Sequence, residues 1–237
     1  MNSTVQTITI LGLVYAFVPA AIVVAVLFRW STSGWSAIYA LARMLLQLLL
    51  VGFALIYIFE TNSVWMVLLV LSVMLLAASW IAMRPVRQKQ PQFYVNAGVA
   101  ILLGGGLTLM MVTQFVLDLQ PWYLPRYVVP LAGMIFASSM NTISLAAERF
   151  EAERGRAVEL RQARAESLQA SMIPVINSLF AVGLVTLPGM MTGQILSGVS
   201  PLVAAKYQIV VMCMIFGASG ISAAIYLALT DDPEQAT

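Results

Sequence analysis

Residues 174–201, PVINSLFAVGLVTLPGMMTGQILSGVSP, form an apolar stretch that is interrupted at Pro188-Gly189 and contains no charged residue. Loops between membrane spans are usually more polar than this one. Irregular backbone is tolerated at membrane depth only where protein or a watery cavity satisfies its N–H and C=O groups. We therefore expect a half-buried turn here, and we expect function to lie close to it.

The rest of the chain has the composition of a polytopic membrane protein. Of its 237 residues, 61% are hydrophobic and 9% are charged, whereas an average soluble domain has about 25% charged residues. A helical span takes about 20 apolar residues, so the length allows roughly six or seven spans and no large soluble domain. The sequence has no histidine and a single cysteine, Cys213, which excludes an internal disulfide and a Cys/His zinc site.

Apolar segments long enough to cross a bilayer follow one another along the whole chain. We predict an all-α bundle that forms one transmembrane domain over residues 1–237, with about seven spans. The predicted spans are residues 5–28, 36–59, 64–83, 94–117, 127–147, 171–187 and 202–229.

Lysine and arginine are concentrated in alternate connections between these segments. One set of connections contains Arg29, then Arg84 with its neighbours, then the arginine-rich residues 148–169. Because Lys and Arg in short loops mark the cytoplasmic side, these connections are predicted to be cytoplasmic. The N-terminus is then outside, residues 188–201 form an outward-side turn, and the tail at 231–237 is inside.

Residues 148–169, ERFEAERGRAVELRQARAESLQ, are the only sizeable hydrophilic segment. They are rich in strong helix formers, and Arg149 and Glu153 are spaced so that they can pair on one helix face. Gly155 interrupts the pattern, which predicts a helix, a bend and a second helix. Two interpretations stay open, namely a solvated connector and a docking element for a cytoplasmic partner.

Polar side chains within the spans are the first candidates for a transport path. Arg43 and Gln47 lie one helical turn apart, and an arginine within a span is a functional candidate unless it snorkels to the interface or packs structurally. The run from Ser138 to Ser144 is too polar to face lipid. It can bond neighbouring helices or line a polar path, which Asn177 and Ser178 would continue.

Glycine and methionine clusters carry two interpretations each. Residues 104–106 are three consecutive glycines, which favours close helix crossing over a bend. The Gly189–Gly193 spacing suits helix pairing or turn geometry. Met190-Met191 can act as soft ligands for a metal such as Cu(I), although methionine more often serves as flexible packing.

Several functions are disfavoured by what the sequence lacks. It has no GxxxxGK[ST] loop for binding phosphates, and no confident span contains Asp or Glu. Because proton- or cation-coupled carriers usually keep an ionisable group at depth, the energy for transport is expected from another subunit. No catalytic pair can be assembled, so we do not expect an enzyme.

Five short motifs occur in order along the chain: RMLLQLLLVG at 43–52, GMI at 133–135, VGLVTLPGMMTG at 182–193, SP at 200–201 and KYQI at 206–209. Together they resemble the bacterial iron-export ABC permease family, to which plant aluminium-tolerance membrane proteins are also similar. The resemblance covers nearly the whole chain. The resemblance implies a multi-pass permease subunit in the inner (plasma) membrane, present as two copies and paired with a separate cytoplasmic ATPase, without a cofactor or nucleic acid.

The polar groups within the spans and the motifs of the resemblance together indicate where site residues are expected. A translocation path or gate is expected at Arg43, Gln47, Ser138, Asn141, Asn177, Met190, Met191, Gln194, Tyr207 and Gln208. ATPase docking is expected on the segment 148–169, at Glu151, Arg154, Arg156 and Arg161. That segment is shorter than in the family, so these four come from its own charges. Bacterial members are associated with iron export; the alternative is a transporter or channel that does not use ATP.

Overall fold

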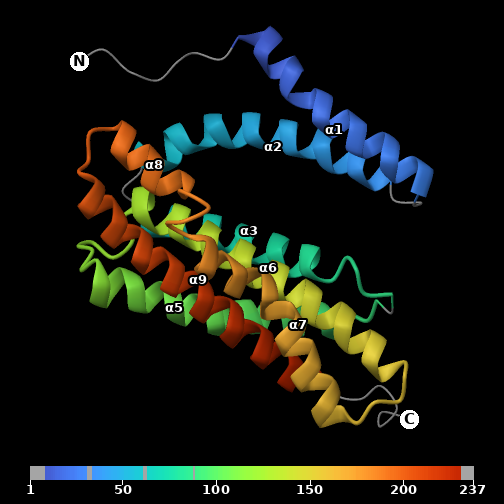
Figure 1. Ribbon diagram of the computed structural model, residues 1–237. Coiled ribbons are helices and arrows are strands. Elements are labelled where there is room, and N and C mark those ends of the chain that lie inside the picture. Colours follow the sequence, from blue (N-terminus) through green and yellow to red (C-terminus); the bar gives the residue numbers. More distant parts are fainter. Residues whose placement is uncertain (1–8, 31–33, 61–62, 88, 231–237) are drawn as a thin grey trace. The chain divides into compact units, whose positions relative to one another are not determined.

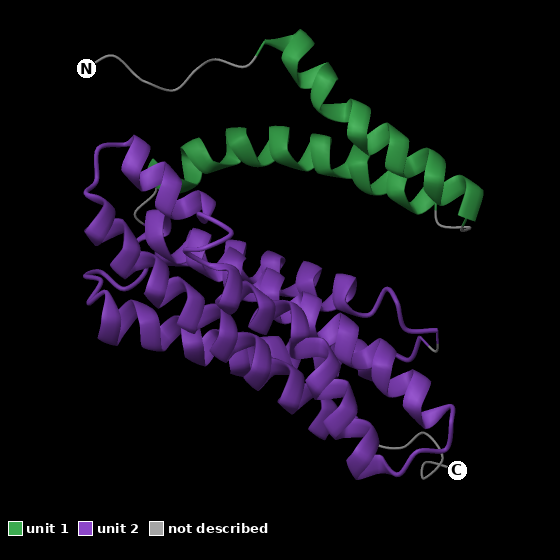
Figure 2. Ribbon diagram, viewed as in Figure 1, with its two compact units in different colours: residues 1–61 green, residues 62–237 purple. Residues whose placement is uncertain are grey.

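The computed structural model describes residues 9–30, 34–60, 63–87 and 89–230. It separates into two compact units, Met1–Thr61 and Asn62–Thr237, which Figure 2 colours green and purple. Residues 5–8 of the first predicted span and the tail at 231–237 lie outside the described residues.

The first unit is a pair of packed helices, α1 (Ile10–Trp30) and α2 (Gly34–Glu60). Phe28 near the end of α1 meets Trp35 at the start of α2 edge to face, with ring centroids 5.6 Å apart. Apart from Gly34, every described residue of the pair, Phe28 and Trp35 included, is exposed or half-buried within the chain. Helices that are apolar on all sides belong in a bilayer or a protein core.

The second unit is a bundle of helices around α6 and α9 (Figure 1). Three of them begin with a proline, namely Pro91, Pro125 and Pro201. Proline is favourable at the first position of a helix, because the N–H group that it lacks would have no partner within the helix there. The elements are α3 (Val64–Ala82), α4 (Pro91–Ala100), η1 (Ile101–Gly105), α5 (Gly106–Met111), η2 (Val112–Val116), α6 (Pro125–Arg154), α7 (Leu160–Ala181), α8 (Gly189–Leu196) and α9 (Pro201–Leu229).

Six helices are long and apolar enough to cross a membrane within the described ranges, if residues Pro91–Val116 are counted as one continuous helix. They are Ile10–Trp30, Gly34–Glu60, Val64–Ala82, Pro91–Val116, Pro125–Arg154 and Pro201–Leu229. The prediction of an all-helical, polytopic membrane bundle is therefore confirmed. Each of these six overlaps a span that we predicted from the sequence.

The predicted span at 171–187 was wrong in its bounds. Helix α7 begins at Leu160, inside the charged segment, and ends at Ala181. It ends there because Gly183 adopts a φ of +85° and the N–H groups of Val185 and Thr186 both turn back to the carbonyl of Ala181, at 2.8 and 3.1 Å. Its 22 residues make a helix about 33 Å long, but only its second half is apolar.

The expected outward-side turn at 188–201 contains a helix of its own. Pro188 precedes α8, which ends at Leu196, and α8 packs against α9. The side-chain oxygen of Ser200 then accepts from the N–H of Val203 at 3.4 Å and caps the start of α9. The segment is therefore structured as helix, turn and cap, and most of its residues are exposed within the chain.

The three glycines at 104–106 bring the helix formed by η1 and α5 against its neighbours, as predicted. A Cβ atom on Gly104 would lie 2.5 Å from the hydroxyl of Ser222 on α9, and one on Gly105 would lie 2.8 Å from a methyl of Ile135 on α6. The helix also has π geometry over Ile101–Gly105. Close packing of α9 and α6 on this helix thus depends on glycine at both positions.

Candidate functional site

A cavity of about 410 Å³ lies within the second unit, between α6, α7, α9 and the start of α8. All of its lining side chains are uncharged. They are Met134, Ser138, Asn141, Thr142, Leu145, Ser171, Pro174, Val175, Ser178, Pro188, Gly189, Met190, Gln208, Val211, Met212 and Ile215. A volume of this size is typical of small-molecule sites, which occupy about 300–1,000 Å³.

Helix α6 contributes one continuous face to the cavity. The lining residues Met134, Ser138, Asn141 and Leu145 follow the three- and four-residue spacing that puts side chains on the same side of a helix. From Met134 to Leu145 the helix rises about 16 Å. The polar run that the sequence marked therefore includes residues that face this cavity.

Other members of the same polar run bond the helices together. Ser222 on α9 donates to the hydroxyl of Ser139 at 3.2 Å, and Ser144 donates to the carbonyl of Ala82 at 2.8 Å. Ser138 does both, because its hydroxyl lies 2.6 Å from that of Ser219 while the residue also lines the cavity. Bonding between helices, one of the two interpretations of the run, is thus confirmed for Ser139, Ser144 and Ser138. A transport path along the run stays a prediction.

Three hydroxyls of the cavity wall donate to carbonyls of their own helices. Thr142 donates to Ser138 at 3.0 Å, and Ser171 and Ser178 donate to the carbonyls of Leu168 and Pro174, both at 2.9 Å. Ser171 and Thr142 are only 0% and 2% exposed, so their hydroxyls serve their own helices. Ser178 is exposed, and its oxygen can still accept a hydrogen bond.

Gln208 on α9 is the most deeply buried amide in the cavity wall, with 6% of the residue exposed. Its side-chain oxygen has no hydrogen-bond partner in the part of the chain that the structure describes. An unsatisfied buried polar atom costs about 1–3 kcal/mol, and such atoms are uncommon in native proteins. Because that oxygen has almost no accessible surface, its lack of a partner lies in the packing of α9 and not at the open face of the cavity.

Three thioethers also meet this cavity, from Met134 on α6, Met190 on α8 and Met212 on α9. Methionine is flexible packing material and a weak acceptor. Within the described residues, no group of three or more His, Cys, Asp or Glu side chains is placed to hold a metal ion. The oxygen and sulfur atoms of the cavity wall are all uncharged.

Four of the predicted path residues line the cavity together, namely Ser138, Asn141, Met190 and Gln208. Four others lie on the same helices but are outside the lining: Asn177, Met191, Gln194 and Tyr207. Thr142 and Ser178, which the sequence marked as polar residues of a possible path, also line the cavity. Ser171 and Met212 line it too and were not selected from the sequence, although helical spacing from Gln208 would have pointed to Met212.

Arg43 and Gln47 belong to α2, in the other unit. When the Gln47 amide is turned so that its oxygen faces the guanidinium, it accepts from Nε of Arg43 at 3.1 Å and from a terminal nitrogen at 3.3 Å. Gln47 thus partners the arginine one turn earlier, as the spacing predicted. This contact makes the arginine less costly inside an apolar helix.

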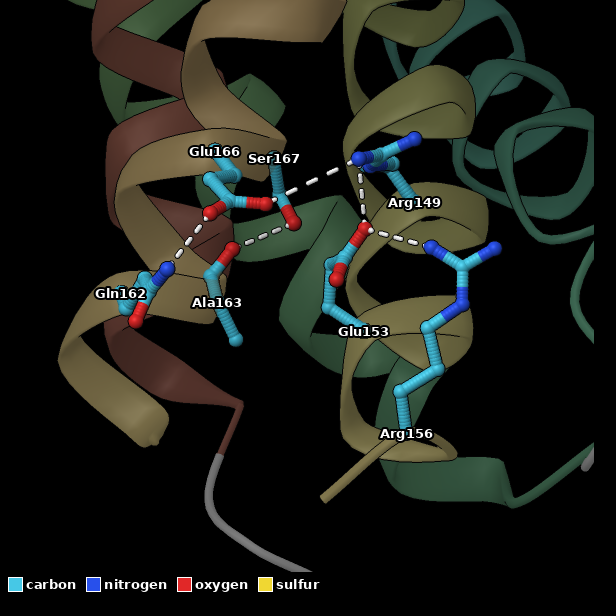
Figure 3. A network of polar contacts seen from close by, with 7 residues as sticks. All are labelled: Arg149, Glu153, Arg156, Gln162, Ala163, Glu166 and Ser167. Atoms are coloured by element: carbon cyan, nitrogen blue, oxygen red, sulfur yellow. Dashed lines mark hydrogen bonds and ion pairs between the residues drawn. The ribbon is translucent and has the colours of Figure 1, made fainter. Parts of the chain in front are cut away.

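The hydrophilic segment forms a hairpin between the end of α6 and the start of α7 (Figure 3). The Glu153 side chain is only 4% exposed, and its oxygen lies 2.6 Å from a nitrogen of Arg149 and 3.3 Å from one of Arg156. Arg149 also lies 3.7 Å from Glu166 on α7. A buried carboxylate shared by two arginines therefore organises the hairpin.

The four residues predicted to dock an ATPase have different surroundings in this hairpin. The carboxylate of Glu151 accepts from the backbone N–H of Arg87 at 3.0 Å, and Arg154 donates to the carbonyl of Val158. Arg156 is exposed but paired with Glu153. Arg161 is exposed on the first turn of α7. Arg156 and Arg161 are thus the exposed members of the four, whereas Glu151 and Arg154 are half-buried.

Long apolar helices that surround a cavity with uncharged walls, together with a charged hairpin, define a multi-pass membrane protein. The chain belongs to the uncharacterised protein family UPF0014, whose model matches residues 8–159 and 154–232. The family resemblance expected from the motifs is thereby confirmed.

Three relatives illustrate the range of the family. The chain is 32% identical to the probable iron export permease protein FetB of Escherichia coli, over 81% of this chain and 79% of the relative. It is 36% identical to the UPF0014 membrane protein STAR2 of rice, over 78% and 69%. It is 34% identical to the protein ALUMINUM SENSITIVE 3 of Arabidopsis thaliana, over 78% and 72%. No solved structure matches the chain.

Proposed function

We propose that this chain is the transmembrane subunit of an ABC exporter driven by a separate ATPase. The observation that carries the proposal is the open cavity between α6, α7, α8 and α9, whose mostly apolar wall contains a few uncharged polar side chains, in a chain related to a probable iron export permease. The absence of a phosphate-binding loop from the sequence fits a protein whose energy comes from a partner.

The orientation follows from the charges. The hairpin of α6 and α7 holds most of the arginines of the second unit and faces the cytoplasm under the positive-inside rule. The N-terminus is then outside, and α8 lies at the outer side. The chain then has to return from the cytoplasmic side to the outer side between α6 and α9. The apolar half of α7 and the short helix α8 together make this crossing in place of a regular seventh span.

The hairpin is the docking surface for the ATPase. About 16 Å of helix rise separates Arg149 in the hairpin from Ser138 in the cavity wall, and α7 likewise runs from Arg161 to the cavity residues Ser171 and Ser178. A displacement of the hairpin is therefore carried along two rigid helices into the cavity wall, as in other shear movements of packed helices.

The outer end of the cavity is the gate. Pro188, Gly189 and Met190 contribute to its lining at the junction between the α7 turn and α8. A Cβ atom on Gly189 or Gly193 would meet no atom of another element within 4 Å, so α8 has room to shift against α9. Two copies of the permease and two ATPase subunits complete the exporter, with iron as the metal to test first.

Co-purification with an ABC ATPase encoded beside this chain tests the proposal. We expect a stable complex in which the chain raises ATP hydrolysis several-fold over that of the ATPase alone. If the chain instead carries solute in liposomes without any nucleotide, it is a self-contained transporter or channel. A chain that neither binds the ATPase nor alters its turnover would contradict the proposal.

A further inference from the structure

We infer that the protein binds one phospholipid of the surrounding membrane in a second hollow, a groove of about 530 Å³ within the second unit. The groove is formed by α3, by the helix that runs from Pro91 to Val116, and by the beginning of α6. It shares no lining residue with the cavity between α6, α7, α8 and α9, so lipid binding here goes beyond the proposed function.

The wall of the groove is suited to a hydrocarbon chain. Most of the lining side chains are apolar, and the two hydroxyls among them are bonded within their own helices. Ser72 donates to the carbonyl of Leu68 at 2.8 Å, and Thr113 donates to that of Leu109 at 2.9 Å. Because neither proton needs a further partner, an acyl chain can fill this wall without leaving a polar group unsatisfied.

The groove has the depth of one leaflet of a bilayer. Gln114 and Val128, at one end, lie within a turn of the ends of their helices, whereas Leu102 and Phe136, at the other, lie near the middle of theirs. The helix rises about 18 Å from Leu102 to Gln114 and about 12 Å from Val128 to Phe136. Half of the hydrocarbon core of a bilayer measures about 15 Å. The groove therefore extends from the membrane boundary to the midplane, as an acyl chain does.

The end of the groove at the membrane boundary has the side chains that occur at the level of lipid headgroups. Trp122 lines it and meets Tyr123 edge to face, with ring centroids 5.7 Å apart. Tryptophan and tyrosine are enriched at the interface between membrane and water. Gln114 is exposed beside them in the lining. The indole N–H and the amide can donate to the ester or phosphate oxygens of a lipid.

The groove is open towards the medium around the helices. Leu102 and Met110 in its wall are 52% and 53% exposed, and they belong to a helix long and apolar enough to cross a membrane. The medium at the depth of Leu102 is then the acyl chains of the bilayer. An apolar wall open to acyl chains, with hydrogen-bond donors only at its outer end, matches a phospholipid in both of its parts.

Gly106 gives the groove part of its width and provides the means to close it. A Cβ atom on Gly106 would meet only a side-chain carbon of Leu102, at 3.7 Å, so the space above the glycine belongs to the groove. A leucine at this position would occupy the space of the acyl chain. Gly217 on α9 is the matched control, because it lies outside both linings and its Cβ atom would meet no atom of another element within 4 Å.

Native mass spectrometry of the full chain tests the inference, after reconstitution in nanodiscs of phosphatidylcholine and transfer into detergent. We expect one phospholipid to stay on most chains. Gly106→Leu should lower this occupancy about tenfold, because extra methylene groups cannot share filled space, whereas Gly217→Leu should retain the lipid like the unmodified chain. Gln114→Leu, at an exposed position, should lower the occupancy about threefold by removing one net hydrogen bond. Unfolding temperatures of all variants check that the chains are folded.

A photoreactive lipid locates the bound molecule. Phosphatidylcholine with a diazirine near the middle of one acyl chain is used in the same preparation, and after transfer into detergent only retained lipid can react. We expect the label within residues 102–110 of the unmodified chain and of Gly217→Leu, and its loss in Gly106→Leu.

Three results would overturn the inference. The first is an unmodified chain that retains no lipid. The second is equal retention by folded Gly106→Leu and Gly217→Leu, or a label that lies outside residues 102–110. The third is a change of oligomeric state in Gly106→Leu without any labelling of the unmodified chain, which would show that a second copy fills the groove. None of these results bears on coupling to an ATPase, so the proposed function would stand or fall separately.

Discussion

At the scale of single residues, Gly104 decides how closely η1 approaches α9. The backbone nitrogen of Ser222 lies 2.7 Å from the place that a Cβ on Gly104 would occupy. Because backbone cannot move aside as a flexible side chain can, a methyl group here must separate the two helices. Overpacking of this kind typically costs about 1–3 kcal/mol.

The substitution Gly104→Ala should therefore lower the free energy of unfolding by about 1–3 kcal/mol, measured by titration with a denaturing detergent. Gly106→Ala is its control, since the nearest atom to its Cβ is a side-chain carbon of Leu102 at 3.7 Å, an ordinary contact. That control should be neutral or slightly stabilising. Equal effects of the two substitutions would contradict close packing at Gly104.

The sequence allowed the polar run of α6 to be recognised, but not the role of each residue in it. Ser138 and Asn141 face the cavity and Ser139 bonds α9, and this division depends on the rotation of α6 about its axis. That rotation is determined by packing against α7, which follows α6 in the chain, and against α3 and α9, which are distant in sequence. Gln208 was selected from a family motif, whereas its unpaired oxygen is visible only in the folded chain.

At the scale of elements, the end of α7 is the feature that the sequence predicted least well. The apolar residues 182–187 continue the hydropathy of the helix, so composition alone extended the span through them. The helix nevertheless stops at Ala181, because Gly183 takes a positive φ and three N–H groups fold back to one carbonyl. A turn made by backbone hydrogen bonds leaves no trace in hydropathy.

Gly183→Ala should destabilise this turn by about 1–2 kcal/mol, because a residue with a Cβ is strained at a φ of +85°. It should also impair transport, since the turn leads directly to Pro188 and Met190 in the cavity wall. Gly193→Ala is the control, because a Cβ atom on Gly193 would have no neighbouring atom of another element within 4 Å. Thermal unfolding of both variants in the same lipid checks the expectation, and an unchanged midpoint for Gly183→Ala would count against a strained turn.

The hairpin of α6 and α7 has its own test in Glu153. Its carboxylate is nearly fully buried and contacts Arg149 and Arg156, and hydrogen bonds to charged groups contribute about 1.5–3 kcal/mol each. Glu153→Gln keeps the shape but removes the charge, so unfolding should become easier by roughly 1–3 kcal/mol.

Glu148 provides the comparison for Glu153, because it is exposed on the same helix. Glu148→Gln should change the free energy of unfolding by less than about 0.5 kcal/mol, as is usual for surface positions. Both variants can be followed by thermal unfolding at low and high salt. If Glu153→Gln were as neutral as Glu148→Gln, the buried carboxylate would not organise the hairpin.

At the scale of the whole molecule, the sequence predicted the class and the helices of the protein well. Long apolar segments define six of the membrane helices, because the bilayer requires length and hydrophobicity that composition reveals directly. The cavity could not be predicted in the same way, since it is built by α6, α7, α8 and α9 together. The cavity arises from the packing of these elements. One of them, α7, is charged over its first half, so hydropathy does not identify it as a regular span.

Coupling between the hairpin and an ATPase is the central claim about the molecule, and ATP hydrolysis by the reconstituted pair tests it most directly. Arg161→Glu reverses an exposed charge on the hairpin, and Arg126→Glu reverses one near the other end of α6. The account predicts that the unmodified chain and Arg126→Glu raise hydrolysis several-fold over the ATPase alone, and that Arg161→Glu loses most of this increase at an unchanged unfolding temperature. Equal hydrolysis with and without the chain would contradict it.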